Sequence, residues 1–456
     1  MTREELHAKI KAQLAAFDAN DWLLLIREQQ AADIADELQQ MDANEVQQLL
    51  VALPDRELAD LFGYFTPAQQ DTLLALFDKN DSARLLAEMA HDERVDIYNR
   101  LSDEKQKAIL PKLAKKEQED ILRLAAYEEG TVGALATSAY VALRAHMTVA
   151  EALRYVRSHA EGMETIYQLY VVDGKQTLLG TLSLRDLMTS DDDAAVAEIM
   201  NTELLTVNAL EPQQAAADMI RRYDLLALPV INGGDRFIGI VTVDDAMDVD
   251  VEESTEDFHK GGGTLALKDV SLREVSTWTM FMKRAPWLLI LVFANMFSGE
   301  VLEYYEDTII TYVALVFFLP LLVDSGGNAG SQAATLMVRA LATGDLHMKD
   351  WFKTLGKEFW VALLLGIAMS VAVFGLGVYR GGVEIAMVVS ISMVAVVLAG
   401  SMIGMSLPFL LSKLKLDPAT ASAPLITSIA DFVGVLLYFY IAVKLLGMPD
   451  IGYLPI

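Results

Sequence analysis

The sequence contains no cysteine among its 456 residues, which excludes disulfide frameworks, thiolate metal sites and cysteine nucleophiles. Positive charge is also scarce, because 36 Lys and Arg stand against 63 Asp and Glu, for a formal net charge of −27. Nucleic-acid binding relies on clustered Lys and Arg. We therefore expect no nucleic acid partner, and multivalent cations suit this composition better.

Catalytic signatures are missing as well. The six histidines are scattered along the chain. No nucleophile and base arrangement, Gly-rich phosphate loop or metal-hydrolase motif rises above chance. We therefore expect that the protein is not an enzyme.

Charge divides the chain into two parts. Residues 283–456 contain ten Lys or Arg and twelve Asp or Glu, so −25 of the net charge falls on residues 1–282. This division predicts an acidic soluble part followed by a membrane part. The first residues, MTREELHAKIKAQLAAF, form an amphipathic helix pattern and lack the apolar core of a signal peptide. We expect the soluble part to stay in the cytoplasm.

A step of twelve residues organises residues 1–128. Apolar residues followed by turn-like or polar ones recur at Met41, Leu53, Phe65, Phe77, Met89, Leu101 and Leu113. The segments between them, such as ANEVQQLLVAL, carry apolar residues at helical spacing with Asp, Thr or Ser placed to cap. The pattern predicts a solenoid of short stacked helices. Such a domain could regulate or dock, or it could be a structural spacer.

Two matching segments follow, LLGTLSLRDLM at 178–188 and FIGIVTVDDAM at 237–247, with glycines at 180 and 239. Each pattern predicts a strand that leads into a helix, and ALPVIN at 227–232 predicts another strand. The pair resembles tandem cystathionine-β-synthase (CBS) domains, at 129–192 and 193–255. That resemblance implies that Ser183, Asp186, Thr242 and Asp245 hold the phosphate and ribose of an adenine nucleotide such as ATP. The same Ser/Thr-x-x-Asp pattern is also an ordinary capping box, and both interpretations stay open.

A run of acidic residues comes next, in VDDAMDVDVEESTEDFHK. On a helix, positions 245, 248, 252 and 256 would line carboxylates along one face, and we expect no basic partner three or four residues away. Oxygen-only clusters suit hard ions such as Mg²⁺, so we favour cation binding over a solvated acidic helix. The three glycines at 261–263 should end the helix, in a connecting region that we place at 245–282.

Five apolar stretches follow, near 285–303, 308–341, 359–379, 384–411 and 421–446, and each is long enough to span a bilayer. Most Lys and Arg between them fall on the side shared with the N-terminus. The positive-inside rule then places the N-terminus in the cytoplasm of a cell (inner) membrane protein and the C-terminus outside.

Polar residues interrupt two of these stretches. Within PLLVDSGGNAGSQAATLMVRALATGDL the small residues predict close helix packing, whereas Asp324, Asn328 and Gln332 need polar partners or a hydrated passage. In the last stretch, SIADFVGVLLYFYIAV places Asp431 in apolar surroundings, with Thr427 four residues earlier. An ionised group in hydrocarbon costs at least about 2.5 kcal/mol, so it normally marks a cavity, partner or ion path.

These two stretches, together with DPATASAPLITSIAD and the order of the domains, resemble the MgtE family of magnesium channels and transporters over essentially the full chain. The resemblance implies a multidomain membrane protein with an all-α superhelical N domain at 1–128, an α/β tandem CBS pair, a connecting plug helix and a five-helix transmembrane domain at 283–456, assembled as a homodimer. It also implies that Mg²⁺ is both the substrate and the regulator.

The same resemblance implies a pore between the subunits in which Asp431 recognises hydrated Mg²⁺, and we expect Asp324, Asn328 and Thr427 to line it. Cytoplasmic Mg²⁺ would close this pore by bridging acidic faces of the soluble domains and plug. The implied sensor residues are Asp224, Asp244, Asp245, Asp248, Asp250, Glu252, Glu253, Glu256 and Asp257. Some members are also tuned by a nucleotide at the CBS pair.

Two other hypotheses about the function stay open. A secondary transporter or exporter could move Mg²⁺ or another divalent cation such as Co²⁺ by the same intramembrane aspartate with alternating access. A membrane-anchored cation receptor would keep the acidic helix but would have no need for Asp431. The sequence leaves the selectivity among divalent cations and the direction of flux undetermined.

Overall fold

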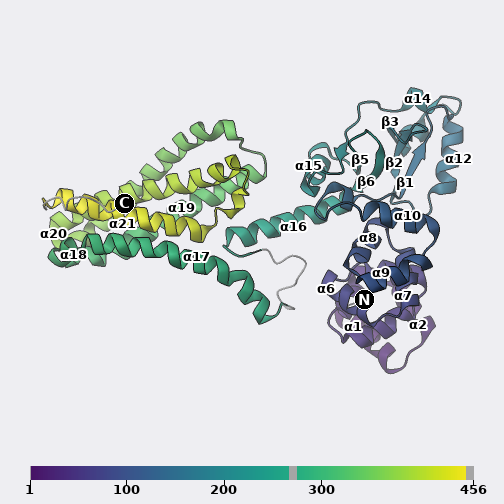
Figure 1. Cartoon of the computed structure of the whole chain (residues 1–456), viewed down its shortest axis with the longest axis horizontal. Coiled ribbons are helices and arrows are strands. Elements are labelled where there is room, and N and C mark those ends of the chain that lie inside the picture. The colour runs from purple at the N-terminus through teal and green to yellow at the C-terminus, as the bar shows by residue number, and fades with distance from the viewer. Residues whose placement is uncertain (1, 266–274, 448–456) are drawn as a thin grey trace. The chain divides into compact units, whose positions relative to one another are not determined.

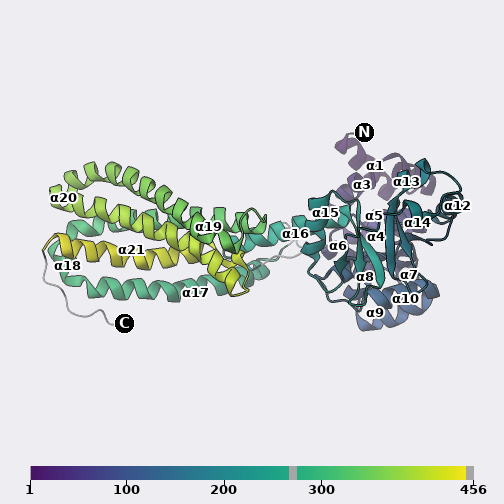
Figure 2. The same cartoon turned by 90° about the horizontal axis from the view of Figure 1, so that it is seen from above.

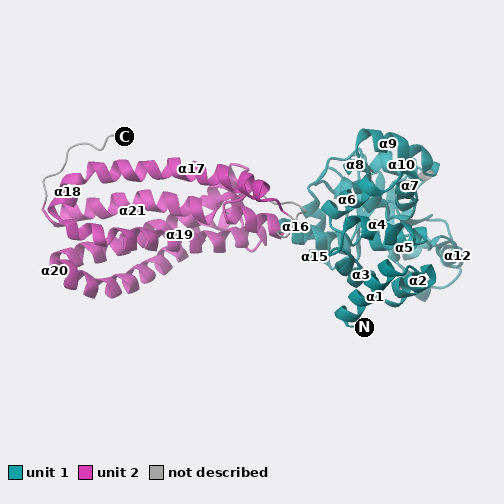
Figure 3. Ribbon diagram, turned by 90° about the horizontal axis from the view of Figure 1, so that it is seen from below, with its two compact units in different colours: residues 1–253 teal, residues 254–456 magenta. Residues whose placement is uncertain are grey.

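The computed structural model of the chain describes residues 2–265 and 275–447 (Figure 1). The chain divides into two compact units, Met1–Glu253 and Ser254–Ile456 (Figure 3). The predicted connecting region 245–282 includes residues 266–274, which lie outside the described residues, as do residues 448–456 of the C-terminus that we expect outside the cell.

The first unit begins with a series of short helices, which we call the helical domain (residues 2–128). Its helices are α1 (Arg3–Ala15), α2 (Ala19–Glu28), α3 (Ala31–Leu38), α4 (Ala43–Val51), α5 (Asp55–Phe62), α6 (Pro67–Leu76), α7 (Lys79–Glu88), α8 (His91–Arg100), α9 (Asp103–Ile109), the 3₁₀-helix η1 (Leu110–Lys112) and α10 (Lys115–Leu124). The twelve-residue step explains their packing, because six of the seven marker residues, all but Met41, are buried in one continuous core. Each helix buries one face against its neighbours, as the sequence predicts.

Short polar side chains start several of these helices. Asp42 accepts a hydrogen bond from the backbone N–H of Asn44, and Asp78 accepts bonds from the N–H groups of Asn80 and Asp81. Because the first N–H groups of a helix have no partner within it, such caps fix where the helix begins. The predicted helix starts are therefore confirmed at these two positions.

The rest of the first unit, which we call the α/β pair (residues 129–253), holds two sheets of the same topology. The first half contains α11 (Val132–Leu135), β1 (Tyr140–Leu143), α12 (Val149–His159), β2 (Thr165–Val172), β3 (Leu178–Ser183) and α13 (Leu184–Thr189); the second contains α14 (Val196–Ile199), β4 (Val207–Asn208), α15 (Gln213–Tyr223), β5 (Ala227–Ile231), β6 (Phe237–Thr242) and α16 (Val243–Gly261), which continues into the second unit. In each sheet the central strand pairs parallel with the first strand and antiparallel with the third.

The matching glycines of the two halves lie where the chain segment before each half contacts a strand of the other half. Gly180 pairs with Val171, and Gly239 pairs with Val230, each beside a register shift. A Cβ on Gly239 would lie 2.5 Å from the carbonyl oxygen of Thr137. Near Gly239, the segment that leads into the first half pairs with β6. Near Gly180, the segment that leads into the second half pairs with β3. The two halves are therefore interlocked, and the glycines make room for the crossings.

Helix α16 follows β6 without a break and ends at Gly261, and Gly263 adopts a φ of +71°. This positive φ is strained for residues with a Cβ, so glycine is the suitable residue at the helix end. The expected break at the three glycines is confirmed.

The second unit is a bundle of long helices that run side by side (Figures 1 and 2). Its elements after α16 are α17 (Thr277–Tyr304), α18 (Glu306–Thr311), the 3₁₀-helices η2 (Val313–Phe317) and η3 (Met348–Asp350), α19 (Leu319–Ala342), α20 (Trp351–Lys413), the 3₁₀-helix η4 (Pro418–Thr420) and α21 (Ala423–Leu445). Helix α20 is two helical arms joined at Gly382, whose φ of +81° is not helical. The arms fold back on each other, since a Cβ on Gly366 would lie 2.9 Å from Cα of Val394.

Three helices in the described part of the chain are long and apolar enough to cross a membrane: Thr277–Tyr304, Met348–Lys413 and Ala423–Leu445. The predicted stretch at 308–341 is not one helix, because the chain leaves the helix at Tyr312, passes through η2 and re-enters a helix at Leu319. Pro320 lies in the first turn of α19, where its missing N–H costs nothing. Helix α19 is not among the three, in keeping with its many glycines and polar residues.

Glycines bring α19 and α20 into direct backbone contact. A Cβ on Gly330 would lie 2.7 Å from the carbonyl oxygen of Gly400, and one on Gly404 would overlap the carbonyl oxygen of Gly330. Such close approach is typical of helices that pack through small residues. It fixes the rotation of α19 and thereby the direction in which its polar face points.

Candidate cation-binding sites

One face of α19 carries polar side chains that remain exposed in the single chain. Asp324, Asn328 and Gln332 follow one another at intervals of four residues and are all exposed, whereas Gly326, Gly327 and Gly330 are buried. Asn328 donates a hydrogen bond of 2.9 Å from Nδ2 to Oδ2 of Asp324. The predicted polar face therefore exists, and the buried glycines serve packing.

Helix α21 places Thr427 and Asp431 beside this face. A Cβ on Gly327 would lie 2.9 Å from Cγ2 of Thr427, so the two helices touch there. The hydroxyl oxygens of Ser331 and Thr427 are 3.4 Å apart. The carboxylate of Asp431 is partly buried, and its charge interacts with that of Asp324. The four predicted pore residues thus lie on adjoining surfaces of α19 and α21.

This arrangement can present a few oxygen ligands to a cation without enclosing it. Among the described residues, no group of three or more His, Asp or Glu side chains is placed to hold a metal ion within one chain. Mg²⁺ keeps several of its waters and is usually bound through one or two carboxylates. Two carboxylates flanked by an amide and hydroxyls suit a hydrated divalent cation.

The acidic helix α16 holds most of the predicted sensor residues on its surface. Asp244 and Asp248 are exposed, and Asp245, Asp250, Glu252, Glu253, Glu256 and Asp257 are partly exposed. Asp224 lies apart from them at the end of α15, in a left-handed conformation with φ of +52°. Burial, followed by the neighbouring charge of Asp244, raises the pKa of Asp248. A like charge nearby disfavours the ionised form and would favour a bound cation.

Several carboxylates of α16 have basic or amide partners, and the expectation that no basic partner lies three or four residues away is wrong. Glu256 pairs with Lys260, one turn later, at 2.6 Å. Asp250 lies 3.4 Å from Arg221 of α15, and Glu252 accepts a hydrogen bond of 3.1 Å from Gln213. The spacing of Glu256 and Lys260 was visible in the sequence, whereas the two partners on α15 depend on the tertiary fold.

The fold brings a further carboxylate, Glu93, to the junction of the helical domain and the α/β pair. Burial raises its pKa to about 7, and the charges of Glu164 and Asp245 add to the shift. Its carboxylate lies against Gly63, where a Cβ would be 2.7 Å from Oε1. Glu93 belongs to no motif, and only the packing of α8 places it beside these acids.

The residues predicted to hold a nucleotide pair with each other where a strand leads into a helix. Ser183 accepts a bond from the N–H of Asp186, and Asp186 Oδ2 accepts bonds from Ser183 N and Oγ at 2.9 and 2.7 Å. The hydroxyl of Thr242 donates a 2.8 Å bond to Asp245. The two pairs occupy equivalent places, at the ends of β3 and β6. Capping is therefore established for Ser183 and Asp186, and nucleotide binding stays a prediction for both pairs.

Family models match three parts of the chain. The divalent cation transporter model named MgtE matches residues 319–441, the model of the MgtE intracellular N domain matches residues 29–130, and the CBS domain model matches residues 132–192 and 196–252. The first of these matches contains the polar face of α19 together with Thr427 and Asp431.

Characterised relatives extend over nearly the whole chain. The magnesium transporter MgtE of Thermus thermophilus is 36% identical over 448 residues, which cover 92% of this chain and 99% of the relative. The magnesium transporter MgtE of Bacillus subtilis is 32% identical and covers 97% of this chain and 98% of its own. Among solved structures, the soluble part of a magnesium transporter is 34% identical with a TM-score of 0.52, covering 56% of this chain and 100% of that one. The cytosolic domain of the Mg²⁺ channel MgtE in complex with ATP is 32% identical with a TM-score of 0.51, covering 53% and 99%.

Proposed function

The chain belongs to the MgtE family of divalent cation transporters, and we propose that it is a Mg²⁺-selective channel of the cell membrane that takes up Mg²⁺ and is closed by cytoplasmic Mg²⁺. The observation that carries this proposal is the placement of two intramembrane carboxylates, Asp324 and Asp431, on helices α19 and α21, which contact each other at Gly327 and Thr427. A carboxylate kept in apolar helices is by default a functional group.

A homodimer would complete the path. The polar face of α19 is exposed in the single chain, yet a polar face toward lipid is unfavourable. Closed two-fold symmetry is the commonest arrangement of oligomers, and it would bring two copies of Asp431 to one axis. Each subunit then contributes Asp324, Asn328, Thr427 and Asp431 around a hydrated ion. Binding through so few ligands stays weak enough to release the ion.

Regulation would reside in the acidic first unit. Without cations, its carboxylates repel one another; Mg²⁺ would bind best where they come together and so favour the compact state. The proposed sensor consists of Asp224 and the acidic residues of α16. ATP at the ends of β3 and β6 would tune this response, supported by the ATP complex of a related cytosolic domain.

The proposed topology places the N-terminus in the cytoplasm and the C-terminus outside, with five spans formed by α17, α19, the two arms of α20, and α21. Three features support it: the length and apolarity of the three long helices, the fold-back of α20 at Gly382, and the Lys and Arg on the cytoplasmic side.

The test is Mg²⁺ uptake into proteoliposomes by the wild type and by Asp431→Ala and Asp431→Asn, at low and high Mg²⁺ on the cytoplasmic face. Glu384→Gln is the matched control, because Glu384 is an exposed carboxylate at the far end of the same bundle. We expect uptake that falls at high cytoplasmic Mg²⁺ and that is lost or unselective only in the Asp431 variants. Equal, selective uptake by Asp431→Ala would remove Asp431 from the path. Transport only when a Na⁺ or H⁺ gradient is imposed would instead identify a secondary transporter.

A further inference from the structure

His91 joins the helical domain to the α/β pair. It is the first residue of α8, and its Nδ1 lies 2.7 Å from the hydroxyl of Ser138, two residues before β1. The same nitrogen lies 3.4 Å from Oδ2 of Asp120 on α10. One imidazole therefore contacts both parts of the first unit.

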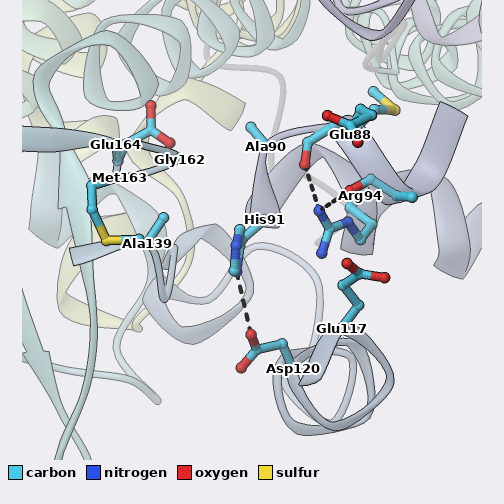
Figure 4. Close-up of a pocket in the computed structure, with 12 residues that line it drawn as sticks. Glu88, Ala90, His91, Arg94, Glu117, Asp120, Ala139, Gly162, Met163 and Glu164 are labelled. Atoms are coloured by element: carbon cyan, nitrogen blue, oxygen red, sulfur yellow. Dashed lines mark hydrogen bonds and ion pairs between the residues drawn. The ribbon is translucent and has the colours of Figure 1, made fainter. Parts of the chain in front are cut away.

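A cavity of about 380 Å³ opens beside this imidazole (Figure 4). The helical domain contributes Met89, Arg94 and Glu117 to its wall, and the α/β pair contributes Met163 and Glu164. The His91 side chain is 17% exposed. Water can therefore reach a group that links the two parts.

The charges around His91 are mainly negative. The carboxylates are Asp120 and Glu117 on α10, Glu88 on α7, Glu93 on α8 itself and Glu164 before β2; the cations are Arg123 on α10 and Arg94 on α8. Arg94 already donates to the carbonyl oxygens of Ala87 and Met89, and Arg123 to Asp120. The positive N-terminus of α8 opposes a cation at its first residue, but the carboxylates outnumber the cations.

Asp120 stays ionised in these surroundings. Although burial raises its pKa, the neighbouring imidazole of His91 and the charge of Arg123 bring it below the usual range. His91 therefore faces a permanent anion on one side and the neutral hydroxyl of Ser138 on the other. Histidine is the side chain that ordinarily gains its charge between pH 5 and 8.

We propose that His91 is a proton-sensitive latch: protonation of its imidazole tightens the docking of the helical domain on the α/β pair. The neutral ring makes one polar bridge to Ser138. The imidazolium donates to the hydroxyl of Ser138 and adds attraction to Asp120 and, across the junction, to Glu164. Attraction to Glu164 acts between the two parts and so favours the docked state.

Docking is measured on the full-length protein in detergent with EDTA, so that no divalent cation contributes. The chain contains no cysteine, so Gln48→Cys on α4 and Glu161→Cys after α12, both exposed, accept spin labels on the two parts. Pulsed electron paramagnetic resonance then gives the ratio of docked to undocked molecules. We expect this ratio to rise about threefold from pH 8 to pH 6, the usual effect of one partly exposed ion pair.

His91→Gln should remove this rise, and His159→Gln, which changes an exposed histidine stacked on Tyr155 of α12, should keep it. Because Glu93 also titrates near neutrality, the series is repeated with Glu93→Gln. If His91→Gln does not fold, Ser138→Asp provides a second test, since a carboxylate opposite the imidazole should enlarge the rise. A pH response that His91→Gln leaves unchanged, or no response in the wild type, overturns the proposal.

The consequence for gating rests on the proposed function. A tighter junction at pH 6 should lower, by about the same factor, the Mg²⁺ concentration that halves uptake. Absence of Mg²⁺ uptake would refute the proposed function but leave the docking result in EDTA intact. Mg²⁺ uptake with a pH response retained in His91→Gln would refute the latch alone.

Discussion

The ammonium of Lys260 lies 2.6 Å from Oδ2 of Asp417, although the two residues are 157 positions apart. Lys260 also lies 2.6 Å from Glu256. Burial lowers the pKa of Lys260, but its hydrogen bonds to these two carboxylates raise it overall. Burial and the charge of Asp417 raise the pKa of neighbouring Asp257. One ammonium thus ties the end of α16 to the segment between α20 and α21 within the second unit.

Replacing this ammonium should make the contact depend on Mg²⁺. In Lys260→Gln, the carboxylates of Glu256, Asp257 and Asp417 remain close together without a positive charge between them. The last turn of α16 should therefore loosen in EDTA and become ordered again when Mg²⁺ is added. We expect amide hydrogen exchange at residues 256–261 to be about fivefold faster in EDTA, which corresponds to about 1 kcal/mol for a partly exposed pair. Mass spectrometry of the exchanged protein measures this.

Lys413→Gln is the control, because Lys413 is an exposed lysine at the end of α20. It should leave the exchange of α16 unchanged. Exchange at 256–261 in Lys260→Gln that matches the wild type in EDTA would show that the ion pair does not hold the helix end.

The contact between α19 and α20 predicts a severe effect at one glycine and a mild effect at another. In Gly404→Ala the new methyl group would overlap the backbone carbonyl of Gly330, which cannot move without shifting α19. We expect a loss of about 3 kcal/mol or more and little folded protein in the membrane. Gly375→Ala, on the same helix with no atom within 4 Å of the new Cβ, should be tolerated. Thermal unfolding in detergent compares the two, and equal melting temperatures would contradict the described packing.

Local patterns predicted much of this fold. The twelve-residue step identified buried residues such as Leu53 and Phe77, and the paired glycines at 180 and 239 identified equivalent strands. Both signals repeat at a fixed spacing, so they can be read without tertiary information. The polar residues of α19 and α21 were found for a similar reason, since polar groups stand out in apolar helices.

Contacts between distant segments could not be read in the same way. Nothing near Lys260 in sequence indicates Asp417, and nothing near Glu93 indicates Gly63 or Asp245. The interruption at Tyr312 was missed because TIITYVALVFFL is mostly apolar and carries no Gly or Pro, and composition alone cannot distinguish a helix from a short 3₁₀ segment there. These features depend on which elements meet, and a single sequence does not supply that.

The pKa of Glu93 predicts a pH dependence of stability. In the folded state it is raised to about 7 from 4.5. Between these values the folded state holds the proton more tightly than the unfolded state, so stability should fall as pH rises from 4.5 to 7 and change no further above 7 through this group. The full shift corresponds to about 3 kcal/mol as an upper estimate. Calorimetry of the cytosolic transition in EDTA at pH 5 and pH 8 measures it.

Glu93→Gln should therefore melt higher than the wild type at pH 8 and about equally at pH 4.5. The exposed Glu45→Gln on α4 is the control and should follow the wild type at both values. A Glu93→Gln variant with wild-type pH dependence would show that Glu93 is better hydrated than its position against Gly63 indicates.

The equivalent hydroxyl and carboxylate pairs at the two strand ends predict how a nucleotide would bind. Asp186 and Asp245 each use one carboxylate oxygen, Oδ2, to accept the hydroxyl of Ser183 or Thr242. If the other oxygen holds ribose hydroxyls, Asp→Asn at the binding half removes a charge-assisted hydrogen bond and should weaken ATP binding by about tenfold or more. The amide can still cap the helix, so helical content should not change. Isothermal titration with ATP on Asp186→Asn, Asp245→Asn and the double variant measures this. Weakening in one variant alone assigns the nucleotide to that half, weakening in both points to two sites, and unchanged affinity in the double variant would leave the two pairs as helix caps only.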